Sequence, residues 1–111
     1  MINRTAVLVR PRQPFVDWAG QLDDRNLLPD PEGERTVYLV PDCKDDIEAW
    51  RILEEGYADI FENELFAWHT IEADWPKKRT FEMFRAWFEI EISSIIEDFC
   101  DYELFDYDNE A

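Results

Sequence analysis

The only histidine of the chain lies close in sequence to two carboxylates, in the pattern His69-x-x-Glu72-x-Asp74. Imidazole and carboxylate groups bind Zn²⁺ and similar cations, so this segment is the strongest metal-site candidate in the sequence. Because 27 of the 111 residues are acidic, such a spacing also arises readily by chance. We therefore interpret the segment as a solvated turn with an exposed histidine, and we predict no bound metal.

The residues that common catalytic and cofactor sites require are scarce. The three glycines are too few for a glycine-rich phosphate loop or a dinucleotide fingerprint. Two adjacent serines, Ser93 and Ser94, have no sequence context typical of a nucleophile. Acidic pairs are so frequent that no general acid–base pair can be singled out. We predict a protein that is not an enzyme, with no catalytic residues and no cofactor.

One basic cluster, Lys77-Lys78-Arg79, precedes Thr80, which is a good residue to begin a helix, and Arg85 follows inside that helix. Free backbone N–H groups at a helix start, together with these cations, would bind a phosphate or a carboxylate. These five residues are therefore the candidate site for a small anion. The alternative is that the cations neutralise carboxylates of the protein itself.

The composition limits the partners. Eleven Lys and Arg against 27 Asp and Glu leave a formal net charge of −16, yet 46% of the residues are hydrophobic and 15% are aromatic. So many aromatic residues exclude a wholly disordered chain. The charge disfavours direct binding to nucleic acid or to an anionic membrane, because the net electrostatic interaction is repulsive.

A basic protein is the partner that this charge predicts, since opposite charges steer association. Acidic residues line much of the surface that the apolar stripe of a predicted helix over residues 45–69 leaves exposed. Trp18 and Trp75 are flanked by polar residues and are candidates to line a groove. The candidate partner-binding residues are Glu55, Asp59, Glu62, Trp18 and Trp75.

The location expected for the protein is the cytoplasm. The first residues lack the apolar core and cleavage site of a signal peptide, and no window approaches the about 20 apolar residues that a membrane span needs. Cys43 and Cys100 are far apart in sequence, so we expect two free thiols in a reducing compartment.

Two short apolar segments, residues 5–10 and 36–40, predict strands that end at Pro11 and Pro41. A short helix over residues 14–21 separates them, followed by a loop over residues 22–33. Residue types recur between the two regions at an offset of 31 to 32 positions, which suggests two strand–helix units. The recurrence indicates either a duplication or merely the pattern that any such unit shows.

Apolar residues at three- and four-residue steps predict two long helices, over residues 45–69 and 80–100, and the second is expected to be central. The fold class is α+β in the order β-α-β-α-α. Because two strands make a marginal sheet, either residues 65–71 form a third strand or two chains pair edge strands in a homodimer. Residues 1–100 form one domain, and residues 101–111 form an acidic tail that is expected to be mobile.

Three stretches of the chain carry a resemblance to known proteins. They read Arg4-Thr5-Ala6-Val7-Leu8-Val9-Arg10-Pro11 with Gln13-Pro14-Phe15 and Trp18, then Thr36-Val37-Tyr38-Leu39-x-Pro41, and then Trp75-Pro76-x-x-Arg79-Thr80 with Met83-Phe84-Arg85-x-Trp87-Phe88. The chain resembles a family of small acidic bacterial proteins of unknown function, outside the loop 22–34 and the acidic tail. The resemblance implies a bacterial, cytoplasmic protein, and it carries over no catalytic or binding residues.

Overall fold

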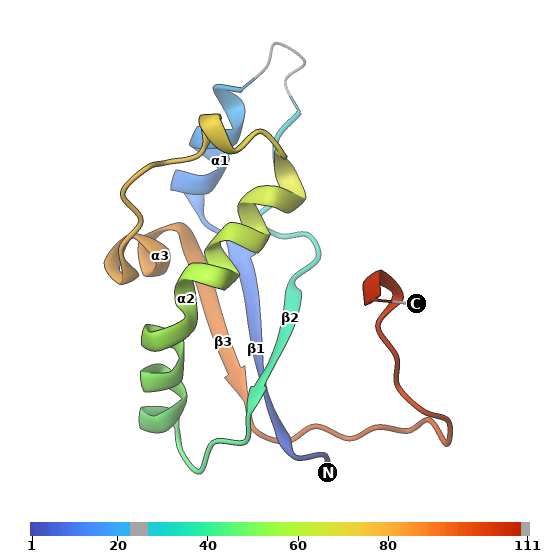
Figure 1. Cartoon of the computed structure of the whole chain (residues 1–111). Helices are drawn as coiled ribbons and strands as arrows, with labels where there is room; N and C mark the ends of the chain where they lie inside the picture. Colours follow the sequence, from blue (N-terminus) through green and yellow to red (C-terminus); the bar gives the residue numbers. More distant parts are fainter. Residues whose placement is uncertain (23–26, 110–111) are drawn as a thin grey trace.

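A three-stranded antiparallel sheet organises the part of the chain that the computed structural model describes. The described residues are 1–22 and 27–109. The strands are β1 (Arg4–Pro11), β2 (Thr36–Pro41) and β3 (Phe88–Ser93), in the spatial order β2-β1-β3. The central strand is β1: its Val7 lies opposite Tyr38 of β2 and Ile92 of β3. Helices cover one face of this sheet (Figure 1).

The described part of the chain also contains three α-helices and two short 3₁₀ turns, and its strands and α-helices follow the order β-α-β-α-α-β. The helices are α1 (Gln13–Gly20), α2 (Asp46–Trp68) and α3 (Phe81–Trp87), and the 3₁₀ turns η1 and η2 span Glu72–Asp74 and Tyr107–Asn109. The Asp45 carboxylate accepts from the Glu48 N–H at 2.9 Å, and the Thr80 hydroxyl accepts from the Met83 N–H at 3.1 Å. These caps satisfy donors that the first helical turn leaves free. The α+β class is confirmed, as are the first two strands.

The prediction of one helix over residues 80–100 is wrong, because α3 ends at Trp87 and the chain continues directly as β3. In β3 the apolar residues Phe88, Ile90 and Ile92 alternate with polar residues, which is the period of a strand. The spacing Phe84, Phe88, Ile92 fits a helix equally well, so the helical interpretation extended too far. The third strand is therefore β3 and not residues 65–71, where α2 continues to Trp68.

The core lies between the covered face of the sheet and the helices. Val7 and Val9 of β1 contact a cluster of aromatic rings from α2, α3 and β3. The ring of Phe61 lies 6.0 Å from that of Phe84 and 5.2 Å from that of Phe88, at geometries typical of aromatic packing. All three rings are fully buried. The packing of these rings joins α3 to α2 and to β3.

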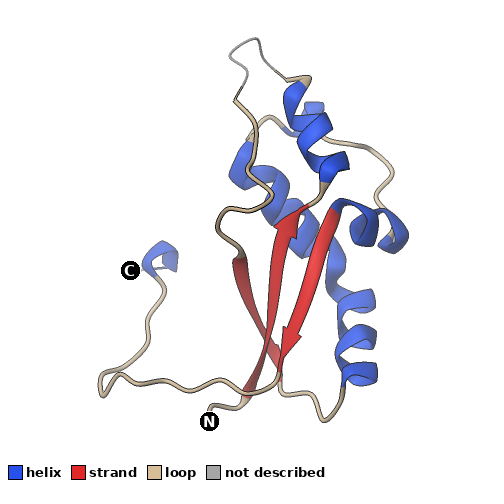
Figure 2. Cartoon of the chain, turned by 180° about the vertical axis from the view of Figure 1, so that it is seen from behind, coloured by secondary structure: helices blue, strands red, loops and turns tan. Residues whose placement is uncertain are grey.

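None of the helices in the described residues covers the other face of the sheet, which Figure 2 shows from behind. Val37 and Leu39 of β2 point to this face and are 57% and 47% exposed. Beyond β3, Ile96 still accepts a backbone hydrogen bond from Ile2 at 2.9 Å. The chain then leaves the body (Figure 1), and Phe99 is 96% exposed.

Candidate interaction surfaces

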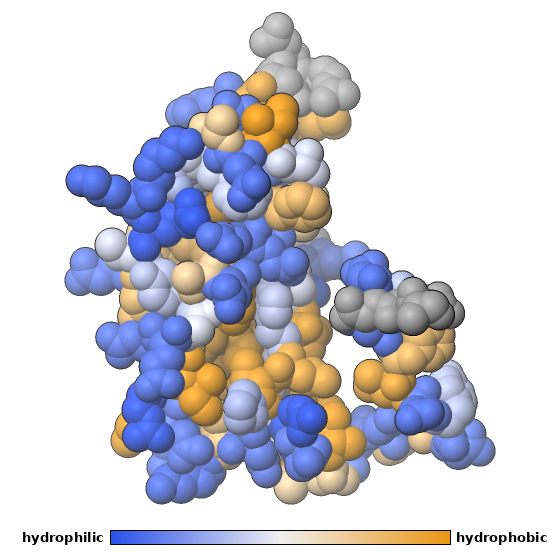
Figure 3. All heavy atoms as spheres, in the orientation of Figure 1, coloured by the Kyte–Doolittle hydropathy of each residue, from blue (hydrophilic) through white to orange (hydrophobic). Residues whose placement is uncertain are grey.

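Carboxylates line the outer face of α2. Glu55, Asp59 and Glu62 follow one another at steps of four and three residues, which place side chains on one face of a helix. All three are exposed, because the opposite face of α2 packs on the core through Leu53, Ile60, Phe61 and Leu65. Hydrophilic residues cover much of this side of the molecule (Figure 3). We call Glu55, Asp59 and Glu62 the α2 stripe.

The basic cluster before α3 does not form one site. Arg79 donates to Glu62 at 2.9 Å and to the Pro76 carbonyl at 2.7 Å, and Lys77 donates to the Ala73 carbonyl at 2.7 Å. The Arg85 guanidinium lies instead over the ring of Trp50, 4.4 Å from its centroid. The fold thus pairs Arg79, a candidate anion ligand, with Glu62, a candidate partner-binding residue.

A groove between Arg12 and Arg85 was not recognised in the sequence. It has a volume of about 420 Å³, and Trp50, Phe88 and Ile90 form part of its wall. Glu82 lines it as well. Arg12 directly follows β1 and Arg85 lies on α3. Both residues line one groove because β3, which follows α3, pairs with β1, and the Arg12 N–H donates to the Trp87 carbonyl at 2.7 Å. Nothing in the local sequence around Arg12 signals this pairing.

The segment around His69 is a turn that side-chain hydrogen bonds hold in place. His69 Nε2 lies 2.8 Å from an Asp74 carboxylate oxygen, and the Trp75 indole donates to the His69 carbonyl at 2.8 Å. The Trp18 indole donates to the Asp74 carbonyl at 3.1 Å. Within residues 1–22 and 27–109, no three His, Cys, Asp or Glu side chains are grouped as metal ligands. The turn therefore uses its polar groups to hold α1 beside the end of α2.

The two tryptophans predicted to line a groove differ in exposure. Trp75 is only 7% exposed and belongs to the core, so it cannot present its ring to a partner, and this prediction is corrected. Its polar flanking residues lie at the surface while the indole turns inward to donate to His69. Trp18 is half-buried, with its ring 5.3 Å from that of Phe15.

A tyrosine–carboxylate pair joins β2 to α2. The Tyr38 hydroxyl donates to Glu64, and the Asn63 amide donates to the Tyr38 oxygen at 2.8 Å. Burial, together with the neighbouring carboxylate, raises the pKa of the Tyr38 phenol above its usual value. Burial also raises the pKa of Glu64, against the opposing effect of hydrogen bonds from Tyr38 and Thr36. Sequence reasoning missed this pair, because its members lie 26 positions apart.

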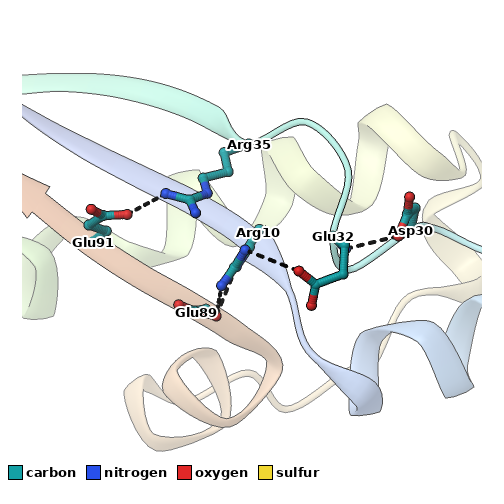
Figure 4. Close-up of polar contacts among 6 residues, drawn as sticks. All are labelled: Arg10, Asp30, Glu32, Arg35, Glu89 and Glu91. Atoms are coloured by element: carbon teal, nitrogen blue, oxygen red, sulfur yellow. Dashed lines mark hydrogen bonds and ion pairs between the residues drawn. The ribbon is translucent and has the colours of Figure 1, made fainter.

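Charged side chains cross the uncovered face of the sheet (Figure 4). Arg10 of β1 pairs with Glu89 of β3 at 2.7 Å and lies 3.9 Å from Glu32. Arg35 pairs with Glu91 of β3. Arg35 directly precedes β2, and β1 lies between β2 and β3, so the Arg35 side chain crosses β1 to reach Glu91. The two arginines therefore tie all three strands together. The positive charges of Arg10 and Arg35 are thus paired with carboxylates of β3.

Comparisons with known proteins identify no relative. No family model, no curated protein sequence and no solved structure matches the chain. Among the described helices, none combines the length and the apolar character needed to span a bilayer.

Proposed function

We propose that the protein is a non-enzymatic interaction protein that binds a basic protein partner through the α2 stripe. One observation carries the proposal. Glu55 and Asp59 are exposed on a long helix, and no ion pair within the described part of the chain neutralises either of them. A helix anchored along its whole length by buried residues presents these charges in a fixed array, which favours recognition over non-specific attraction.

The surroundings of the stripe support the same function. Phe66, four residues beyond Glu62, is 55% exposed and supplies an apolar contact at the end of the stripe. Interfaces typically combine such an apolar anchor with charges at the rim. The net charge of −16 would accelerate the encounter with a cationic partner at low ionic strength.

The experiment compares three immobilised forms of the full chain in extract from the native cell. They are the wild type, the reversal Glu55→Lys/Asp59→Lys/Glu62→Lys, and the matched control Asp42→Lys/Glu72→Lys/Glu103→Lys, which changes the net charge equally at other exposed positions. We expect a basic protein on the wild type and the control but not on the stripe reversal. The purified pair should then associate more slowly as salt rises, because screening shortens electrostatic steering. Equal capture by all three forms would disprove the stripe as the binding site.

A second candidate function is the binding of a small anion, for which the groove between Arg12 and Arg85 is better suited than the segment 77–80. No ion pair within residues 1–22 and 27–109 joins either guanidinium to a carboxylate, although Glu82 shares the groove. Titration of inorganic phosphate into wild type and Arg12→Ala/Arg85→Ala tests this function by amide chemical shifts. Shifts that persist in the double variant would exclude the groove.

We further propose a cytoplasmic location in a bacterium, and self-association through a sheet edge as the form that a homodimer would take. The outer edges of β2 and β3 are the ones available for pairing, because β1 is central. Sedimentation velocity over a concentration series measures self-association directly. A monomer at all concentrations would remove the dimer from the proposal.

A further inference from the structure

A pocket opens where four segments meet near the carboxyl end of α2. Its volume is about 240 Å³. Its apolar wall consists of Pro11 at the end of β1, Phe15 of α1, Pro29 of the loop before β2, and Ala67 and Trp68 of α2. Phe15 is only 4% exposed and forms a rigid part of that wall. The pocket is smaller than the roughly 300–1,000 Å³ typical of small-molecule sites, so it suits a single side chain.

Three carboxylates line the same pocket: Asp30, Glu34 and Glu64. No lysine or arginine is among the described residues of its lining. Glu64 is held in place by the hydroxyl of Tyr38 and by Thr36, which use only part of the accepting capacity of a carboxylate. Asp30 is likewise oriented, because one of its carboxylate oxygens accepts from the Glu32 N–H at 2.9 Å. The pocket thus combines an apolar wall with an anionic rim in which Glu64 and Asp30 are positioned before any ligand arrives.

We propose that this pocket binds one arginine side chain of the basic protein partner. The methylene groups of an arginine would cover Phe15 and the prolines, and its guanidinium would stack on Trp68 and donate to Glu64 and Glu34. Arginine fits better than lysine, because a planar guanidinium stacks on an aromatic ring and donates in parallel to a carboxylate. This inference rests on the proposed function and adds to it a second contact point, on the C-terminal part of α2.

The test uses a probe of defined chemistry, so that it does not depend on finding the partner. N-acetyl-Gly-Arg-Gly-amide is titrated into the ¹⁵N-labelled full chain, alongside the same tripeptide with lysine and with citrulline, the neutral isostere of arginine. We expect saturable shifts in the indole N–H of Trp68 and in the amides of residues 29–34 and 64–68. The dissociation constant should lie in the millimolar range for a single side chain, and the citrulline peptide should bind at least tenfold more weakly.

Variants separate the pocket from general acidity. Glu34→Gln should weaken the arginine peptide severalfold and Trp68→Ala tenfold or more, whereas Glu54→Gln, which removes an exposed charge of α2 outside the pocket, should leave binding unchanged. Glu34 is exposed in a loop, so its variant tests the pocket without disturbing the Tyr38–Glu64 pair. Equal binding of the citrulline peptide, or shifts spread over the acidic surface, would overturn the pocket. Equal binding of the lysine peptide would overturn the choice of arginine.

The outcome also distinguishes the pocket from the α2 stripe. If the arginine peptide does not bind but the wild-type protein still captures its partner, the pocket is removed and the proposed function stands. Peptide binding in the pocket together with a stripe reversal that has no effect would move the partner interface from the stripe to the carboxyl end of α2.

Discussion

Glu62 and Glu55 lie on the same face of α2, yet their neighbours give them different roles. Glu62 is paired with Arg79 and so helps to join α2 to the segment before α3. No cation among the described residues pairs with Glu55, and its charge is available to a partner. The same distinction holds for Arg10 and Arg35, whose charges are used to tie the strands of the sheet. At the scale of single residues, pairing decides which charges are structural.

The titration of Glu64 predicts a pH-dependent contribution to stability. Burial raises the pKa of Glu64 above its usual value of 4.5, so the folded protein holds this proton more tightly than the unfolded chain does. The contribution is therefore complete below the usual value and is lost as the pH rises through the folded pKa. We expect the free energy of unfolding of the wild type, relative to Glu64→Gln, to fall between pH 4.5 and pH 7.5.

Urea unfolding at the two pH values measures this difference, in dilute solution because the isoelectric point is near 4.2. Glu55→Gln is the matched control for loss of an exposed carboxylate from the same helix. A difference that rises with pH would contradict the prediction.

Two phenylalanines, one buried and one exposed, should differ in how much they contribute to stability. Phe84 is fully buried against Phe61 and Phe88, so Phe84→Ala should lower the free energy of unfolding by about 3–5 kcal/mol. Phe99 is almost fully exposed, and Phe99→Ala should change the free energy of unfolding by less than about 0.5 kcal/mol. Chemical denaturation of both variants measures the contrast. Equal effects would place Phe99 in the core and contradict its exposure.

At the scale of elements, β3 shows how one sequence pattern can serve two structures. Thr80 begins a helix, but eight residues later, at Phe88, the chain turns into a strand that pairs with β1. Pairing on both sides of β1 gives the sheet three strands, which is the number needed for a stable sheet with one apolar face. The partnership with β1 therefore stabilises the extended form of residues 88–93 over continuation of the helix.

The strand assignment predicts an alternating response to substitution. Ile90 faces the core and is half-buried, so Ile90→Ala should cost about 2 kcal/mol. Glu91 lies on the uncovered face, where its exposed ion pair with Arg35 contributes less, and Glu91→Ala should cost under about 1 kcal/mol. Thermal unfolding of both variants checks this, with hydrogen exchange of the β3 amides as an independent readout. A larger cost for Glu91→Ala would argue against the strand.

At the scale of the whole molecule, charge and burial are distributed unevenly. The body buries most of its aromatic rings fully or in part, whereas the segment after Glu97 carries Tyr102, Leu104 and Tyr107 in largely exposed positions among carboxylates. Within this segment, the ring of Tyr107 lies 4.9 Å from the ring of Phe105, measured between centroids. The stability of the body should therefore depend little on this segment.

Deletion of residues 101–111 tests that independence. It removes Asp101, Glu103, Asp106, Asp108 and Glu110, and no basic residue. We expect the melting temperature to change by no more than about 2 °C, since exposed residues outside the core contribute little to folding. Circular dichroism measures the transition, and a large decrease would show that the tail docks on the body.

The sequence by itself determined the α+β class, the first two strands, α1, α2 and the Thr80 cap, because these features depend on local patterns of apolar, capping and breaking residues. Only the tertiary structure decided that residues 88–93 are a strand, that Trp75 is buried and that Arg79 pairs with Glu62. It also decided that Arg12 and Arg85 line one groove. Each of these depends on contacts between segments far apart in sequence. A spacing of four residues fits both a helix and a strand, and a run of charges does not say which partners it will have.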